Sequence, residues 1–164
     1  MYSRNGNTAI AIVLVILLMA GSVGAFFMMQ MLMNNNPDPH DTVYNYTFEG
    51  TIDGEDYTGT GIRERFVESS TEYDYTLTYT VSSSAKTITD ECYIFYGKDD
   101  KPVSKVFTYV GTDKIDDIEV EIWTYEKKET GTLYTYYTGG QSMLYRVIIT
   151  SDNTTLTGDI ILYE

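Results

Sequence analysis

The side chains that acid–base or nucleophilic chemistry needs are few in this chain. His40 is the only histidine, and it lies next to Pro39 in a segment whose composition predicts a spacer. A Ser-His-Asp or Cys-His apparatus needs its histidine held against the nucleophile by a rigid scaffold. We therefore interpret His40 as a solvated linker residue. Cys92 is the only cysteine, and its apolar, strand-like setting DECYIFYG favours a small buried residue over a reactive thiol.

Motifs for metals, phosphates and paired-acid chemistry are incomplete. The acidic stretch DKIDDIEVE at 113–121 lacks the DxDxDG spacing of a calcium loop, and isoleucines interrupt its oxygen ligands. The triplet Gly59-Thr60-Gly61 has no following lysine, as a phosphate loop requires, and is typical of a bend in a strand. No pair of carboxylates is singled out for glycoside hydrolysis. We predict no cofactor, no metal and no catalytic residue, and expect that the chain is not an enzyme.

Aromatic side chains are the strongest candidates for binding. A curved sheet could present them as a face for a lipid, a glycan or another apolar ligand. The alternative is that the same rings form the core and its rim. The residues concerned are Tyr73, Tyr75, Tyr79 and Trp123, with Tyr93, Tyr134 and Tyr136.

Two triplets match the N-glycosylation sequon. They begin at Asn45 and Asn153, and both fall in strands or turns of the segment that we expect outside the cell. They agree with an external location.

Residues 9–33 form an uncharged run in which Ser22 and Gln30 are the only polar side chains. As a helix, this run spans roughly 37 Å at about 1.5 Å per residue, enough to cross a hydrocarbon core of about 30 Å. We predict a transmembrane helix over 9–33, with the bilayer as its partner and self-association through small residues such as Gly21 and Gly24 as an option. Arg4 lies before the helix and two aspartates follow it, so residues 1–8 are expected in the cytoplasm.

Two alternatives concern processing of this segment. A cleaved secretory signal would end at Val23-Gly24-Ala25. The stretch TAIAIVLVILLMAGSVGAFF resembles the N-terminal helix of archaeal type IV pilins, which implies cleavage after Gly6 and filament assembly through the helix. The chain departs from the pilin pattern because Asn5, not a cation, precedes Gly6, and because no glutamate lies in the first turn.

Residues 34–41 contain three asparagines and two prolines and predict a stiff spacer, and residues 42–164 predict one β domain. Alternating apolar and polar residues indicate about nine strands with turn formers between them, at intervals too short for crossover helices. We therefore predict a mainly β, antiparallel meander shaped as a barrel or half-barrel, with a sandwich as the alternative. The predicted strands are 43–48, 57–67, 73–81, 87–96, 103–110, 118–122, 132–138, 143–150 and 156–163.

The charge of the chain is strongly negative. The net charge is −13, and Arg4 is the only charged residue among the first 33, so the remainder carries −14. Such a surface repels nucleic-acid backbones. We expect a single-pass protein of the cell membrane whose outer domain has a binding or structural role at the cell surface or envelope, with a protein or glycan partner that the sequence does not identify. The alternatives are a pilin-like subunit and a half-barrel carrier of an apolar ligand.

Overall fold

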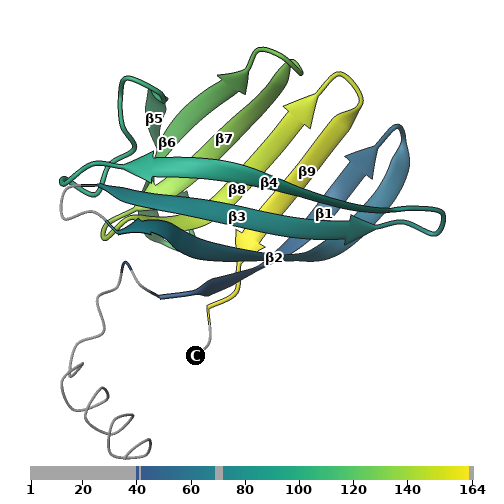
Figure 1. The fold of residues 1–164 in the computed structure, drawn as a ribbon, viewed down its shortest axis with the longest axis horizontal. Helices are drawn as coiled ribbons and strands as arrows, with labels where there is room; N and C mark the ends of the chain where they lie inside the picture. Colours follow the sequence, from purple (N-terminus) through teal and green to yellow (C-terminus); the bar gives the residue numbers. More distant parts are fainter. Residues whose placement is uncertain (1–39, 41, 69–71, 163–164) are drawn as a thin grey trace, which may run out of the picture. The chain divides into compact units, whose positions relative to one another are not determined.

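The computed structural model describes residues 40, 42–68 and 72–162, which form a nearly all-β domain (Figure 1). The predicted helix over 9–33 and most of the predicted spacer lie outside the described residues. In the described part of the chain, no helix has the length and apolar character needed to span a bilayer. The strands are β1 (Tyr44–Ile52), β2 (Glu55–Glu68), β3 (Tyr73–Ser82), β4 (Thr87–Tyr96), β5 (Thr108–Ile115), β6 (Ile118–Lys127), β7 (Thr132–Gly139), β8 (Met143–Ser151) and β9 (Thr154–Ile160).

The nine strands form one open antiparallel sheet, in the order β4-β3-β2-β1-β9-β8-β7-β6-β5. The prediction of a mainly β, antiparallel domain is confirmed, and the strands belong to one sheet instead of the two that a sandwich requires. Each strand pairs with its neighbours in sequence, except that β4 and β5 do not pair and form the two edges, while β1 also pairs with β9. The segment between β4 and β5 therefore connects the two edges of the sheet.

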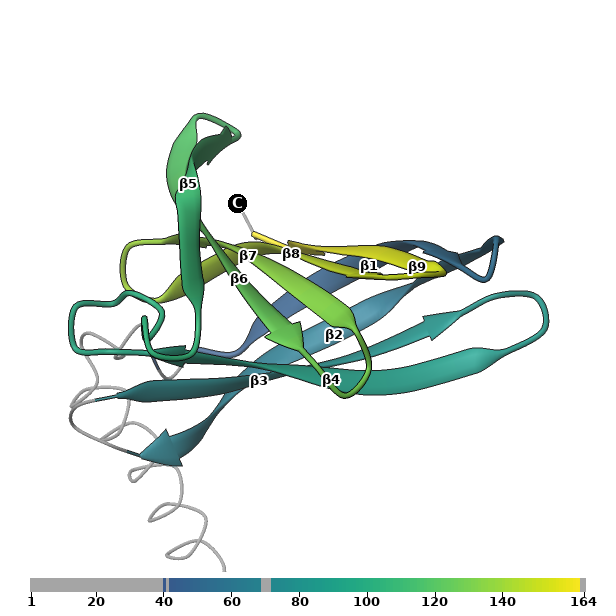
Figure 2. The ribbon, with the colours of Figure 1, turned by 90° about the horizontal axis from the view of Figure 1, so that it is seen from above.

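The sheet curls strongly, and β3 and β4 pass across the face formed by β6, β7 and β8 (Figures 1 and 2). The turn end of the hairpin of β5 and β6 projects from the rest of the domain (Figure 2), while residues 121–127 of β6 pair with β7. Inward-facing residues at every second position form one core that draws on both halves of the sheet. Because both halves contribute, the curl buries the apolar face that a flat sheet would leave in water.

Phe48 in β1, an interior strand of the sheet, shows why particular glycines are needed next to it. Its ring lies over the neighbouring strands, where a Cβ on Gly158 would come within 2.4 Å of Cζ and a Cβ on Gly61 within 2.7 Å of Cε2. Both approaches are closer than atoms allow, so the ring packs directly on the backbone of β2 and β9.

The predicted position of β5 is wrong. We expected a strand over 103–110, but β5 runs from Thr108 to Ile115. A β-bulge between Tyr109 and Gly111 lets the strand pass through the glycine. The turn after β5 is made by Asp116 and Asp117, whose φ angles of 48° and 65° lie in the left-handed region that aspartate tolerates.

Candidate functional site

An apolar gap separates the edge strand β4 from β6 and β7, where the curled sheet fails to close. It contains a cavity of about 260 Å³, and its lining includes Cys92 and the exposed Val106. Most of the lining is aromatic, with rings from Tyr93, Phe95, Phe107, Tyr125, Tyr134 and Tyr136. We call this cavity and its rim the apolar gap.

Phe107 bridges the two sides of the apolar gap. It comes from the segment that connects the sheet edges, and it is 2% exposed. Its ring centroid lies 6.1 Å from that of Phe95 in β4 and 5.6 Å from that of Tyr136 in β7. The Tyr136 hydroxyl also donates a hydrogen bond of 3.0 Å to the carbonyl of Tyr93. One buried ring and one hydrogen bond thus connect β4 to β7.

The rim of the apolar gap exposes further apolar side chains. Phe66 and Tyr93 are 48% and 41% exposed, and their rings meet edge to face at 5.9 Å. Phe66 also lies 6.4 Å from Phe95. Val106 continues this exposed surface to the cavity. A pocket with an apolar rim is typical of a surface that takes an apolar group from a partner.

Burial favours the neutral forms of three side chains in the apolar gap, Cys92, Tyr134 and Tyr136. Burial raises the pKa of the Cys92 thiol to about 12, and the nearby Asp90 carboxylate adds to the shift. Burial likewise raises the pKa of Tyr134 to about 12 and that of Tyr136 well above its ordinary value. The thiol is therefore protonated and unreactive at neutral pH, as the sequence predicted for a small buried residue.

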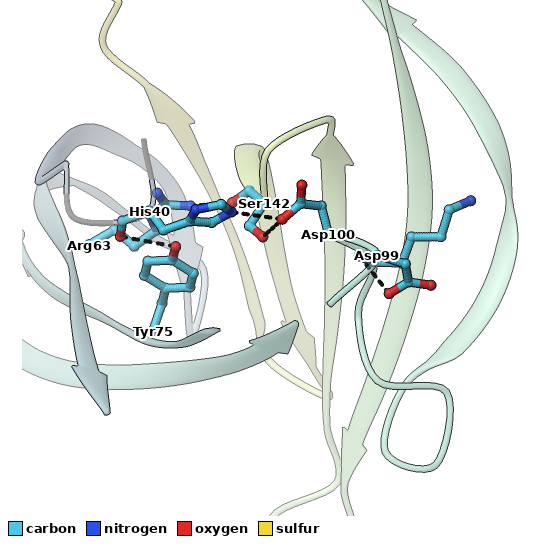
Figure 3. Close-up of polar contacts among 7 residues, drawn as sticks. His40, Arg63, Tyr75, Asp99, Asp100 and Ser142 are labelled. Carbon is cyan, nitrogen blue, oxygen red and sulfur yellow. Dashed lines mark hydrogen bonds and ion pairs between the residues drawn. The ribbon is translucent and has the colours of Figure 1, made fainter. Parts of the chain in front are cut away.

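A polar network joins three loops to the sheet, apart from the apolar gap (Figure 3). Asp100 lies in the segment between β4 and β5, and its Oδ1 lies 2.7 Å from Nε2 of His40. The same oxygen accepts a 2.9 Å hydrogen bond from Oγ of Ser142, in the turn between β7 and β8. Ser142 in turn offers its carbonyl to Nη1 of Arg63 in β2, at 2.6 Å. We call these four residues the polar network.

The polar network contains a serine, a histidine and an aspartate, but they are not arranged for nucleophilic catalysis. A catalytic serine must give its proton to the histidine, which the aspartate holds from its other side. Here the serine and the histidine both bind the same aspartate oxygen, and the serine is fully buried. The arrangement ties segments of the fold together.

His40 is not the solvated linker residue that we predicted. Its side chain is 11% exposed, its ring stacks on that of Tyr73 at 3.6 Å, and its carbonyl accepts a hydrogen bond from Tyr75. The prediction failed because it took the spacer as separate from the domain. In the structure, His40 packs on β3 through Tyr73 and Tyr75.

Arg63 is a fully buried cation at the centre of this region. Its guanidinium carbon lies 4.1 Å from the ring centroid of Tyr75 and 4.8 Å from that of Tyr44. Within the described residues, no carboxylate is close enough to form an ion pair with it, and its Nε and Nη2 have no hydrogen-bond partner. A buried guanidinium is usually paired, so this one is an exception.

The aromatic residues that we predicted for a ligand-binding face lie in two places in the structure, the core and the apolar gap. Tyr75, Tyr79 and Trp123 are buried core residues, and Tyr73 is half-buried against His40. The other three predicted rings, Tyr93, Tyr134 and Tyr136, all line the apolar gap.

The two predicted glycosylation sites differ in exposure. Asn153 is exposed in the turn between β8 and β9, whereas Asn45 is half-buried in the interior strand β1.

Sequence reasoning missed Phe107, Arg63, Asp100 and Ser142. Burial of Arg63 could have been predicted, since Gly59, Gly61 and Arg63 alternate along β2 and so face the same side of the sheet. Nothing in the sequence marked Asp100 or Ser142, because their contacts join turns that are 42 residues apart.

The search for related proteins gave no match among protein-family models, curated proteins or solved structures. Among residues 40, 42–68 and 72–162, no group of three acidic, histidine or cysteine side chains could hold a metal ion. The candidate site therefore rests on the geometry of the apolar gap alone.

Proposed function

We propose that the chain is a membrane-tethered binding protein of the cell surface or envelope, and that its outer β domain captures a partner protein in the apolar gap. The observation that carries the proposal is an aromatic-lined cavity between the edge strand β4 and the strands β6 and β7 of the open sheet. The exposed rings around it supply the surface that surrounds a bound anchor.

The size of the cavity supports a single side chain as the anchor. About 260 Å³ is below the roughly 300–1,000 Å³ of sites for drug-sized ligands, and above the roughly 150 Å³ of an engineered cavity that takes benzene. One aromatic or branched aliphatic side chain fits this range. The carrier alternative has less support, because interior rings such as Tyr46, Tyr75 and Tyr96 have no exposed surface and fill the space that a stored lipid would need.

The net charge adds a preference for the partner. The chain beyond residue 33 carries −14, so a basic partner associates faster and a nucleic acid is repelled. Glu91 and Lys127 both line the apolar gap, so it can accept polar groups of either sign beside the anchor.

Blocked amino acids test the proposal directly. The full chain in lipid nanodiscs is titrated with the N-acetyl amides of phenylalanine, leucine and serine, and amide resonances are followed by NMR. We expect the phenylalanine and leucine probes to shift resonances of β4 and β7 saturably, and the serine probe to leave them unchanged.

A matched pair of variants locates the effect. Val106→Asp places a charge at the rim of the apolar gap and should abolish binding, whereas Leu133→Asp alters a β7 residue of similar exposure that does not line the gap. Equal loss of binding in both variants, or equal shifts with all three probes, would contradict the proposal.

The tether is tested by the intact mass of the native protein in membrane and medium fractions. A membrane-bound chain that retains residues 1–33 agrees with the proposal. A chain that starts at Asn7 would instead support the pilin-like alternative, and one that starts at Phe26 in the medium would indicate a secreted protein.

A further inference from the structure

The unpartnered nitrogens of Arg63 share one edge of its guanidinium. Nη1 donates to the Ser142 carbonyl, and the remaining groups, Nε and Nη2, have no partner in the described chain. In a planar guanidinium these two nitrogens form the side-on fork, so their N–H bonds run nearly parallel. This is the geometry that binds the two oxygens of a carboxylate.

Burial makes this open edge costly. Arg63 is 0% exposed, so bulk water does not reach these two donors. Two tyrosine rings and one carbonyl offset part of the cost of the buried charge, but they leave two donors on the same edge unsatisfied. An anion on that edge would supply both the missing acceptors and the missing negative charge.

A second buried donor lies in the same region. The hydroxyl of Tyr96 has no hydrogen-bond partner among the described residues. The Tyr96 ring meets the Tyr75 ring edge to face at 5.7 Å, and the Tyr75 ring lies under the guanidinium. Burial raises the pKa of Tyr96 well above its ordinary value, and the Arg63 charge opposes the shift, so both groups act in one environment.

We propose that the Nε–Nη2 edge of Arg63 is a binding site for a small monocarboxylate, of the size of formate or acetate. Two parallel N–H···O bonds hold the carboxylate, and its charge neutralises the guanidinium. The surrounding tyrosines are packed, which limits the ligand to a few atoms. Because Arg63 has no exposed surface, exchange of the ligand requires local opening of the polar network. This site does not depend on the proposed function of the apolar gap.

The arginine side chain itself reports binding. The full chain, labelled with ¹⁵N and placed in lipid nanodiscs, is titrated with sodium formate or sodium acetate, and with sodium chloride at matched ionic strength. We expect a saturable shift of the Arg63 Nε–H resonance with the carboxylates and a much smaller shift with chloride. An unchanged Nε–H resonance, or equal shifts with all three salts, would overturn the proposal.

Variants separate this site from general salt effects. Arg63→Met removes the fork and keeps an unbranched apolar stem, and Arg65→Met removes a partly exposed arginine of the same strand that lies 5.1 Å from the Tyr73 ring. Acetate should raise the melting temperature of the wild type and of Arg65→Met by about 4 °C, and should leave Arg63→Met unchanged. Should Arg63→Met fail to fold, the wild-type Nε–H titration decides alone.

The chain's own carboxylates provide the last control. Asp41 follows His40 in sequence, and a carboxylate of the chain on Arg63 would make an external ligand unnecessary. In Asp41→Asn we expect the Nε–H resonance of the ligand-free protein to stay in place and the acetate response to persist. A resonance that moves in this variant before any acetate is added would overturn the proposal.

Discussion

The apolar gap and the polar network both connect distant strands of the sheet, the first through apolar rings and the second through hydrogen bonds. Each connects strands that are far apart in the sheet order, where no ladder of backbone hydrogen bonds is available. In the apolar gap, the connection is the buried ring of Phe107 and a single hydrogen bond from Tyr136 to Tyr93. In the polar network, every contact is a hydrogen bond or ion pair between His40, Asp100, Ser142 and Arg63.

The apolar gap leaves an unfilled volume, whereas the polar network leaves hydrogen-bond donors without acceptors. Rings pack by shape, so an imperfect fit in the apolar gap leaves a volume of about 260 Å³. Hydrogen bonds are directional, so an imperfect fit beside the polar network leaves donors without acceptors, on Arg63 and Tyr96. The first suits an apolar side chain and the second a small anion.

The largest effect is expected from Phe107→Ala, which removes the ring that connects the two sides of the apolar gap. Truncation of a buried phenylalanine lowers the free energy of unfolding by about 3–5 kcal/mol, because the apolar contacts are lost and a larger cavity is left. Urea unfolding of the full chain measures the change.

Val106→Ala is the control for Phe107→Ala, since it alters the preceding residue, which is 42% exposed. We expect its free energy of unfolding to stay within about 0.5 kcal/mol of the wild type. A small effect for Phe107→Ala, similar to that of Val106→Ala, would show that the ring does not hold the two sides together.

The next effect is a loss of stability at alkaline pH. Burial raises the pKa of Tyr46, Tyr96 and Tyr136 in the folded state. A tyrosine in the unfolded chain has a pKa of about 10. Below that pH the folded and unfolded states bind the same protons on these residues. Above it only the unfolded chain releases them, so each of these tyrosines lowers the free energy of unfolding by about 1.4 kcal/mol per pH unit.

Unfolding by urea at a series of pH values measures this slope. Tyr136→Phe should reduce the pH slope of the free energy of unfolding by the contribution of one tyrosine. The variant also lacks the hydrogen bond that spans the apolar gap. A stability that does not fall between about pH 10 and pH 11 would contradict the buried, neutral state of these hydroxyls.

The fold was largely predictable from the sequence, because it follows from local alternation. Residues such as Tyr75 and Tyr79 alternate with polar neighbours, and the structure places them in the core. The pairing of β1 with β9 could not be predicted in this way, since alternation fixes which face a strand buries but does not identify its neighbour. The bounds of β5 were missed because a bulge carries the strand through Gly111.

The candidate site was only partly predictable, and for a related reason. Tyr134 and Tyr136 of the apolar gap were candidates because they are aromatic. Their proximity to Phe107 could not be predicted, because it depends on the curl of the sheet. The polar network depends on turns from distant parts of the chain. Its members Asp100 and Ser142 adopt left-handed φ angles of 59° and 54°. Such angles are uncommon in residues other than glycine, so the sequence does not predict them at these positions.

The smallest of the expected effects tests the polar side of the comparison. Asp100→Asn keeps an oxygen that can accept a hydrogen bond, and asparagine tolerates the φ angle of 59°. It removes the charge that strengthens the bonds from Ser142 and His40. We expect the free energy of unfolding to fall by about 1 kcal/mol, measured by urea unfolding at neutral pH.

Asp99→Asn is the matched control, because Asp99 is exposed and accepts a long bond, of 3.3 Å, from the Lys101 backbone. Its effect should stay within about 0.5 kcal/mol. The double variant of Asp100→Asn with Phe107→Ala then shows whether the two connections act separately. Additive losses mean that the polar network and the apolar gap hold the curl independently, whereas a coupling above about 0.5 kcal/mol would mean that they form one unit.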